Sequence, residues 1–553
     1  MGDPEQTRSR AWFSERYGVA VWAASLCLVT AFAPAQTKIE IQPLAPGLRP
    51  EGRIHATVDG QELPLVGRRV WHADSAGEHY MEVAAARFAA GGPAKVICTA
   101  GANYFGEAVM RSLAAEIPLK HSGAAFAFEL PGPGDYYLRL PGLAGSNGTF
   151  TVAFFVDDLA AFDQVRARLS ANNDANVANQ GVRPDPELDQ TAPIQRLLDR
   201  GGSLWFPPGV YRSGTLHVRS DTTVCLAPGA VLRASDKQDA VGPEFIAVEN
   251  ATHVKLCGWG IIDAHSLSTH RRHGVHNVNI TSSRDVTIEN LLLDDSNSWA
   301  VHIRRSDRFT ARNVKVFSGK DGFDPDSSRD VTIEGAFVVS ADDAIAVKNR
   351  FPQDADGKTT ERVTFRNSIV TTPKSALKIG TETRGPIRDV TFENCEVFDG
   401  DRGIVLYARD GGPIERVAWR NIRLSMIDWP QEKASGTVFD IGVVRREAPT
   451  PVRDCLIENI TANWIYRSDF AGLPEAPLDS IRMRDIRVKA ETPKSGRPFL
   501  FQCGDNVRIT IERLNIDWQG NQRLWAGVAS GNCLVLTGST NQPDTETSKQ
   551  NNK

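Results

Sequence analysis

The chain has 553 residues, of which 24% are charged and 41% hydrophobic, and its formal net charge is −4. This composition is ordinary for a globular protein and excludes a disordered chain, a collagen and a coiled coil. Lys and Arg number 63 against 67 Asp and Glu, so no basic excess exists to neutralise many phosphates, and we expect no nucleic-acid partner. The 46 Gly and 31 Pro indicate a chain rich in turns.

A long apolar run lies near the start of the chain, from Tyr17 to Ala35. It ends in Ala33-Pro34-Ala35, the small-x-small pattern that precedes signal-peptide cleavage. The alternative is an anchoring helix, although the run is just short of a bilayer span. We expect residues 1–35 to be a signal peptide, and the mature protein to be secreted, extracellular or periplasmic, without membrane contact after cleavage.

After cleavage seven Cys would remain, which is too few for a disulfide scaffold in a chain of this length. Cys503 and Cys533 could close one C-terminal loop. Because seven is an odd number, at least one thiol stays free.

Residues 36–156 alternate short apolar segments with Gly- and Pro-rich turns, such as Ala125-Phe126-Ala127-Phe128 before Pro131-Gly132-Pro133-Gly134. This spacing predicts a small β-sandwich. The polar, Asn-rich segment 157–188 is expected to be a linker. Thr191 to Arg200 then has the pattern of a short amphipathic helix.

An internal repeat occupies the rest of the chain. The phrase Arg-Asp-Val-Thr-Ile-Glu-Asn begins at Arg284, and related copies begin at Arg308, Arg329, Arg362, Arg388, Arg416 and Arg453. The shared apolar residues Val286, Phe309 and Val331 are 23 and 22 residues apart, and longer steps imply loop insertions. One such unit cannot bury its apolar face, but stacked units can.

Each repeat contains two or three short Val/Ile/Phe strands followed by a polar turn, without the 3.6-residue periodicity that a helical solenoid needs. The sequence therefore predicts an all-β protein, a right-handed parallel β-helix over 189–537 that follows the β-sandwich, with 538–553 as a disordered tail.

Stacking makes residues at equal distances from the marker residue neighbours on successive coils. Twelve residues on, one column contains Ser298, Asp321, Asp343, Ser375 and Arg402. Fifteen residues on, another contains Asp324, Ala346, Lys378 and Val405, and seventeen on, a third contains Asp326, Lys348, Gly380 and Tyr407. Asp342 adds a further carboxylate beside the first column.

Crowded carboxylates repel one another, so their retention at one place needs a reason. Asp residues also cap turns, and we expect this of Asp326 and Asp330. For Asp321, Asp342 and Asp343 we expect catalysis, and a calcium site made of the same oxygens is the alternative. Carboxylates about 6.5–9.5 Å apart suit an inverting glycosidase, in which one protonates the leaving oxygen and another activates water.

From roughly Asp189 to Val444 the sequence resembles the polygalacturonase clan of glycoside hydrolases, which comprises family 28 and the related dextranase/isopullulanase family 49. Gly258-Trp259-Gly260 and Asn297-Ser298-Trp299-Ala300-Val301-His302 are similar to landmarks of family 28. Lys320-Asp321-Gly322 stands where the family has Asn-Thr-Asp-Gly, and Asp342-Asp343 matches its paired Asp. The resemblance implies Asp342 as the general acid, with Asp321 and Asp343 holding and deprotonating the water.

Two motifs of family 28 are changed. Its Gly-His-Gly reads Lys374-Ser375-Ala376, and its Arg-Ile-Lys, which grips galacturonate, reads Val405-Leu406-Tyr407. The second change favours an uncharged or differently charged glycan, and an N-terminal β-sandwich is also a feature of the dextranase branch. The predicted substrate-binding residues are Lys348, Ser375, Lys378, Arg402 and Tyr407, with Arg409 as a further cation that could replace the lost pair.

Aromatic rings often stack on sugars, and Tyr407, Trp299 and Trp429 are candidates, whereas Trp299 could equally lie in the core. Lys348 could instead pair with Asp326 and Asp342, and His302 has the setting of a structural histidine.

We expect a monomeric glycoside hydrolase that cleaves an α-linked polysaccharide with inversion, either a dextran- or pullulan-like glucan or a pectic glycan. We expect no cofactor and no metal. The rival hypotheses are a calcium-dependent polysaccharide lyase and a glycan-binding solenoid without activity.

Overall fold

The computed structural model describes residues 37–540 except 45–46, 75–76, 114, 144–148, 172–174, 353–358, 428, 430–435, 492–498, 519–526 and 531–532. The predicted signal peptide and residues 541–553 of the predicted tail lie outside the described residues. Within the described part of the chain, no helix has both the length and the apolar character needed to cross a membrane.

Two β-sheets form the N-terminal part, and their facing sides enclose one apolar core. The first contains β1 (Ile39–Ile41), β4 (Val66–Asp74), β5 (Gly77–Ala90), β7 (Val109–Ser112), β10 (Gly134–Pro141) and β11 (Thr149–Asp158). The second contains β2 (Ile54–Val58), β3 (Gln61–Leu63), β6 (Ala94–Ala100), β8 (Leu119–Ser122) and β9 (Ala125–Leu130). Except for the parallel pair of β5 and β11, the neighbouring strands are antiparallel.

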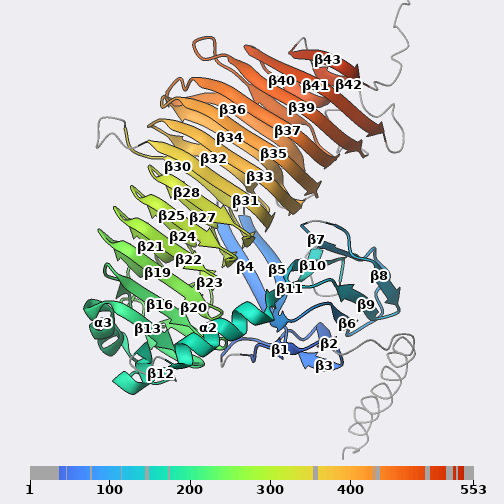
Figure 1. Ribbon diagram of the computed structural model, residues 1–553. Helices are drawn as coiled ribbons and strands as arrows, with labels where there is room; N and C mark the ends of the chain where they lie inside the picture. Colours follow the sequence, from blue (N-terminus) through green and yellow to red (C-terminus); the bar gives the residue numbers. More distant parts are fainter. Residues whose placement is uncertain are drawn as a thin grey trace, which may run out of the picture.

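The rest of the chain is a right-handed parallel β-helix, which confirms the predicted fold class (Figure 1). Its 12-stranded sheet consists of β15 (Leu216–His217), β18 (Glu244–Glu249), β21 (His276–Thr281), β24 (Val301–Arg304), β27 (Phe323–Asp326), β30 (Ile345–Asn349), β32 (Ser375–Thr383), β34 (Arg402–Asp410), β36 (Thr437–Ala448), β38 (Ser468–Ala471), β40 (Phe499–Cys503) and β42 (Gly527–Ser530).

The 20-stranded sheet covers the remaining faces of the coils. It begins with β12 (Asp185–Asp189), β13 (Gly202–Phe206), β14 (Gly209–Ser213), β16 (Thr222–Leu226), β17 (Ala230–Ala234), β19 (Thr252–Gly258), β20 (Ile261–Asp263), β22 (Arg284–Glu289), β23 (Leu292–Ser296) and β25 (Asp307–Arg312). It continues with β26 (Lys315–Ser318), β28 (Arg329–Glu334), β29 (Phe337–Ser340), β31 (Thr360–Thr371), β33 (Ile387–Gly400), β35 (Ile414–Met426), β37 (Val452–Trp464), β39 (Leu478–Ala490), β41 (Val507–Trp518) and β43 (Leu534–Thr540). β43 therefore reaches three residues into the segment expected to be a tail.

The marker residues of the repeat stack directly on one another in the core. Val286 pairs with Phe309 and Phe309 with Val331, and the ladder continues through Val363, Val390 and Val417. All six are at most 1% exposed. The register predicted from the repeat is confirmed, so the column arithmetic holds for the coils that carry the acids.

Left-handed backbone on both sides of each marker residue favours Asp before the marker and Asn at the end of the repeated phrase. The residue before each marker has a positive φ, as at Asp285 (56°) and Asp330 (55°), and so does the residue that closes the phrase, as at Asn290 (60°) and Asn313 (53°). Asn and Asp tolerate this conformation better than most residues. The closing Asn side chains also bond to one another, at 2.8 Å between Asn313 Nδ2 and Asn290 Oδ1.

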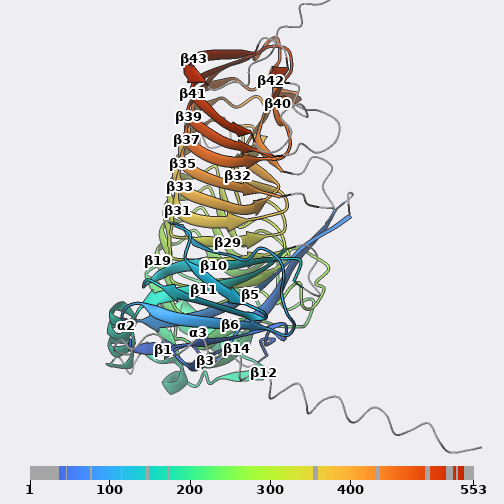
Figure 2. The same cartoon turned by 90° about the vertical axis from the view of Figure 1, so that its right-hand side faces the viewer.

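The N-terminal sheets pack on the lower coils of the solenoid (Figure 2). Tyr137 stacks on Phe398 at 4.1 Å, and Phe155 meets Phe337 at 5.1 Å. Buried ion pairs join the two parts, among them that of Lys315 with Asp135 at 2.5 Å. This broad apolar interface fixes the two parts to each other.

The segment 157–188 is not the expected linker. It contains the end of β11, the helix α2 (Leu159–Ala171), the 3₁₀ helix η2 (Val177–Gln180) and the start of β12. Phe162 of α2 packs on Trp259 of the solenoid at 4.9 Å, so the segment is ordered by apolar contact. The predicted helix at Thr191–Arg200 is present as α3, and Ile194, Leu197 and Leu198 bury its apolar face against the first coil.

Disulfides join Cys503 to Cys533, as the sequence suggested, and Cys225 to Cys257, which it did not. Cys225 and Cys257 are register partners on β16 and β19, so the stacking of two coils brings their sulfurs together. Among the described residues Cys98, Cys395 and Cys455 are free and buried.

Candidate active site

Three carboxylates meet where two adjacent coils turn from the 20-stranded into the 12-stranded sheet. Asp321 lies between β26 and β27, and Asp342 and Asp343 lie between β29 and β30. One oxygen from each of the three lies within 4.8 Å of the others. Asp321 and Asp343 are 2% and 5% exposed, whereas Asp342 is the more accessible. These nearest oxygens are closer than the separation of about 6.5–9.5 Å expected between the carboxyl groups of an inverting pair.

Buried hydroxyl groups fix the backbone of the two turns. Ser318 Oγ donates to the Asp321 carbonyl at 3.0 Å, and Ser340 Oγ donates to the Asp342 carbonyl at 2.9 Å. Thr372 of the next coil also donates to the Asp342 carbonyl. These residues were not among the predicted site residues, although Ser296, Ser318 and Ser340 recur every 22 residues and form a register column.

Two buried lysines form ion pairs with the acids. Lys348, on β30, lies 2.8 Å from Asp321 and 2.6 Å from Asp324, and its ammonium group lies 3.9 Å from the centre of the Trp299 ring. Lys378, on β32, donates to Asp343 at 2.5 Å. Among the described ion pairs, Lys348 therefore contacts Asp321 and Asp324 and not the expected Asp326 and Asp342. Its side chain points toward Asp324.

The charges of the neighbours separate the pKa values of the acids. Burial, and then the negative charges of Asp321 and Asp343, raises the pKa of Asp342 to about 7. Burial opposes ionisation of Asp343 as well, but the charges of Lys378 and Lys348 outweigh it and lower its pKa. One carboxyl in the cluster can therefore hold a proton near neutral pH while a neighbour stays charged.

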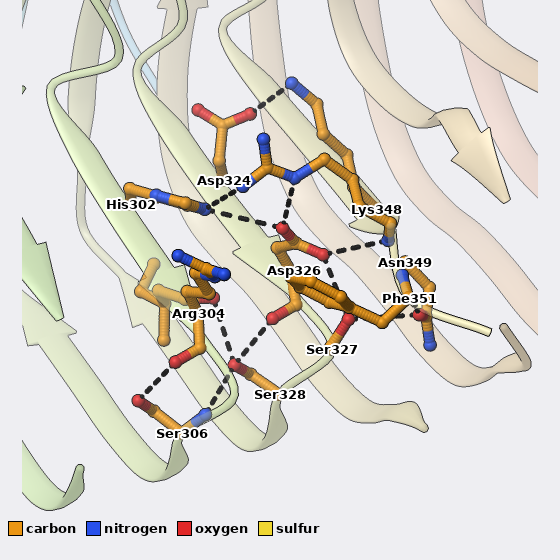
Figure 3. Close-up of polar contacts among 12 residues, drawn as sticks. His302, Arg304, Ser306, Asp324, Asp326, Ser327, Ser328, Lys348, Asn349 and Phe351 are labelled. Atoms are coloured by element: carbon orange, nitrogen blue, oxygen red, sulfur yellow. Dashed lines mark hydrogen bonds and ion pairs between the residues drawn. The ribbon is translucent and has the colours of Figure 1, made fainter. Parts of the chain in front are cut away.

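Residues of β24, β27 and β30 form a second polar cluster (Figure 3). Asp326 accepts from Arg350 Nε at 2.6 Å and lies 3.4 Å from His302 Nε2, while Asp324 faces Lys348. Burial would raise the pKa of Asp326, but His302 and Arg350 hold it well below its usual range. Asp326 is therefore a buried ion-pair partner and not the expected turn cap, and His302 is structural, as expected.

Asp330 also differs from the expected turn cap. It pairs with Arg362 of the next coil at 2.6 Å on the solenoid surface.

The predicted substrate-binding residues occupy different depths. Ser375 is 1% exposed and its backbone N–H donates to Asp343 Oδ1 at 3.2 Å, so it positions an acid. Arg402, its register partner on the next coil, is partly exposed. Tyr407 is partly exposed too, and its hydroxyl donates to Asp440. The Arg409 guanidinium lies 4.7 Å from the centre of the Tyr407 ring.

The aromatic candidates also separate. Trp299 is partly exposed next to the acids, whereas Trp429 is 4% exposed in the interface with the N-terminal sheets. Trp429 is therefore not a sugar-stacking residue, because the apolar side chains around it exclude a ligand. Val405 is fully buried as well and does not line a groove.

Among the residues that the structure describes, two acidic clusters have oxygen and nitrogen atoms close enough to hold a metal ion. In the triad, two ammonium groups already bond to the carboxylates, which does not fit a divalent cation. The other cluster consists of Asp263, His265 and Asp295. Its Asp263 accepts a hydrogen bond from Arg233 at 2.7 Å, and the Ser268 N–H donates to Asp295 at 3.2 Å. Protein groups thus satisfy both clusters, and we assign a metal to neither.

Part of the solenoid is similar to a known family. Residues 204–431 match the model of the glycosyl hydrolases family 28, a range that contains all three acids. A probable polygalacturonase of Vitis vinifera is 27% identical over 345 residues, which cover 54% of this chain and 70% of that protein. The chain is a glycoside hydrolase, and it is similar to polygalacturonases.

Solved structures agree on the fold of this glycoside hydrolase. The family 28 exopolygalacturonase of Yersinia enterocolitica matches with a TM-score of 0.52 at 12% identity, covering 81% of this chain and 96% of that one. Dex49A from Penicillium minioluteum matches with a TM-score of 0.53 at 13% identity, covering 86% and 90%. Both branches of the predicted clan therefore share its architecture.

Proposed function

We propose that the protein hydrolyses an α-linked acidic polysaccharide of the pectic type, with inversion, through Asp321, Asp342 and Asp343. The observation that carries this proposal is the triad itself, in which one carboxyl has a pKa of about 7 among neighbours that are ion-paired with lysine. Asp342 is also the most accessible of the three, as a proton donor to a bound polymer must be.

The reaction follows from these charge states. Asp342 gives its proton to the glycosidic oxygen as the bond from that oxygen to the anomeric carbon breaks. Asp321 and Asp343 hold a water molecule, and one of them takes its proton as the oxygen attacks the same carbon. Because the water attacks directly, the configuration inverts, and the proton lost by Asp342 is replaced from solvent.

Cations around the triad support an acidic substrate. Lys320, Lys374, Arg402 and Arg409 are all partly exposed, and Lys320 and Arg402 lie next to or in the column of the acids. The Vitis relative, named a polygalacturonase, points to the same class of substrate. A neutral α-glucan is the second candidate, because Tyr407 stands where family 28 has a lysine.

A panel of polygalacturonate, rhamnogalacturonan, dextran and pullulan tests the proposal. We expect reducing ends to appear fastest from one of the two pectic polymers, and the first product, followed by proton NMR, to have the inverted anomeric configuration. Chelator should have no effect, and no unsaturated product should absorb in the ultraviolet, as a lyase would produce. Faster cleavage of dextran or pullulan would establish the neutral substrate.

We also propose that the protein is secreted and acts as a monomer. The two disulfides fit an oxidising compartment, and the apolar run Tyr17–Ala35 precedes the first strand. Mass spectrometry of protein recovered from the culture medium should find Gln36 at the N-terminus, and light scattering should give the mass of one chain.

A further inference from the structure

Each of the two acids beside Asp342 has its own buried lysine. Lys348 Nζ lies 2.8 Å from Asp321, and Lys378 Nζ lies 2.5 Å from Asp343. The lysines are 4% and 7% exposed, so little of either can meet a polysaccharide. They come from β30 and β32, which are neighbouring strands of the 12-stranded sheet.

We propose that Lys348 and Lys378 are positioning residues that keep Asp321 and Asp343 charged and thereby confine the catalytic proton to Asp342. This inference rests on the proposed function of the triad and replaces the substrate-binding role that the sequence suggested for both lysines.

The charges facing the cluster from every side support this assignment. The two ammonium groups lie on Asp321 and Asp343, and burial together with the negative charges of these two acids raises the pKa of Asp342 to about 7. Lys348 also faces Asp324 and Glu382, and Arg402 acts on Asp343 from the next coil.

Asp324 shares Lys348 with Asp321, at 2.6 Å from its ammonium nitrogen. It is fully buried, and burial together with the charge of Asp321 raises its pKa well above the usual range. The face of the Trp299 ring, 3.9 Å from Lys348 Nζ, favours the charged ammonium group and fills the space on its other side.

The pH dependence of kcat/KM tests the proposal, measured on the polymer that the wild type cleaves fastest. In Lys348→Met and Lys378→Met the carboxylate loses its cationic partner, so the acid limb of the profile should move up by about one pH unit or more. Lys348→Arg keeps the charge and should leave the limb within a few tenths of a unit of its wild-type position.

Lys315→Met is the matched control. Lys315 is a buried lysine of the same solenoid, ion-paired with Asp135 at 2.5 Å, but it lies at the interface with the N-terminal sheets. This variant should melt earlier and keep the wild-type pH profile. If Lys348→Met and Lys378→Met lose activity with an unmoved acid limb, or only raise KM, the lysines are structural or bind substrate, and the proposal is wrong.

Infrared difference spectroscopy shows which carboxyl holds the proton. It needs neither an activity assay nor the methionine variants. The C=O band of a protonated carboxyl should disappear near pH 7 in the wild type and be missing from Asp342→Asn. Loss of that band from Asp321→Asn, Asp324→Asn or Asp343→Asn instead would place the proton elsewhere and overturn the proposal. If no polymer in the panel is cleaved, the proposed function fails, while this measurement still tests the charge assignment.

Discussion

The β-helix carries aspartates in two settings, one on its surface and one at the corner that holds the triad. On the surface, the Asp of one repeat pairs with the Arg of another, in Asp285–Arg308, Asp330–Arg362, Asp389–Arg416 and Asp485–Arg513. Bonding to Arg308 lowers the pKa of Asp285, and Arg362 does the same for Asp330. We call these four pairs the surface ladder.

At the corner one aspartate, Asp342, behaves in the opposite way. The partners are lysines, the groups are buried, and the pKa of Asp342 rises where those of the surface ladder fall. The ladder recurs with the repeat phrase, whereas Asp342-Asp343 lies outside that phrase. Charges that recur with the repeat thus serve stacking, and those that break the pattern mark the site.

The largest effect should come from the same substitution made in both settings. Asp342→Asn removes the proton donor and should lower the rate by about 10²–10⁴-fold, the usual contribution of general acid catalysis. Asp330→Asn, in the surface ladder, should leave the rate within about twofold. Initial rates of reducing-sugar release on the best polymer measure both, and wild-type turnover by Asp342→Asn would remove the basis for the comparison.

The second prediction concerns stability against pH. The pKa of Asp342 is raised from 3.8 to about 7, so between these pH values the folded protein holds a proton that the unfolded chain has released. The wild type therefore loses stability as pH rises through this window and changes no further above it.

Asp342→Asn cannot titrate, so its melting temperature should gain on that of the wild type from about pH 4 to about pH 7, by the equivalent of roughly 4 kcal/mol. Asp330→Asn should show no such gain. Scanning calorimetry across the window checks both, and a constant difference at all pH values would show that Asp342 does not hold the proton.

The sequence was sufficient to predict the fold and the proximity of the acids. In stacked coils, residues at equal distances from the marker residues become neighbours. It predicted the register of Val286, Phe309 and Val331, and with it the meeting of Asp321 with Asp343. Spacing does not show toward which face a long side chain turns.

For this reason the predicted ion-pair partners of Lys348 were wrong, and the burial of Ser375 and Trp429 was not predicted. The contact of α2 with Trp259 was not predictable either, since it depends on how the N-terminal sheets dock on the solenoid.

The third prediction, with a smaller effect, tests whether bound sugar reaches beyond the triad toward the C-terminal coils. Tyr407 lies two coils beyond the nearest acid turn, partly exposed, with Arg409 over its ring at 4.7 Å. Tyr407→Ala should raise KM about fivefold, the equivalent of roughly 1 kcal/mol, as expected for loss of an aromatic contact.

Tyr407→Phe keeps the ring and loses only the bond to Asp440, so its KM should stay close to that of the wild type. An unchanged KM in Tyr407→Ala would mean that bound sugar does not reach this coil.

The smallest effect belongs to the surface ladder. Arg416 is 50% exposed and pairs with Asp389 at 2.7 Å, and exposed pairs of this kind contribute about 0.2–1 kcal/mol, less at high salt. Arg416→Ala should therefore lower the free energy of unfolding by no more than about 0.5 kcal/mol in 0.15 M salt, and the difference should shrink further as salt is added. Lys315→Ala provides the contrast, because it leaves Asp135 without its partner at a buried interface and should cost several times more, with little dependence on salt. Chemical denaturation at two salt concentrations measures both, and an equal loss in the two variants would mean that the ladder stabilises the coils as strongly as a buried pair.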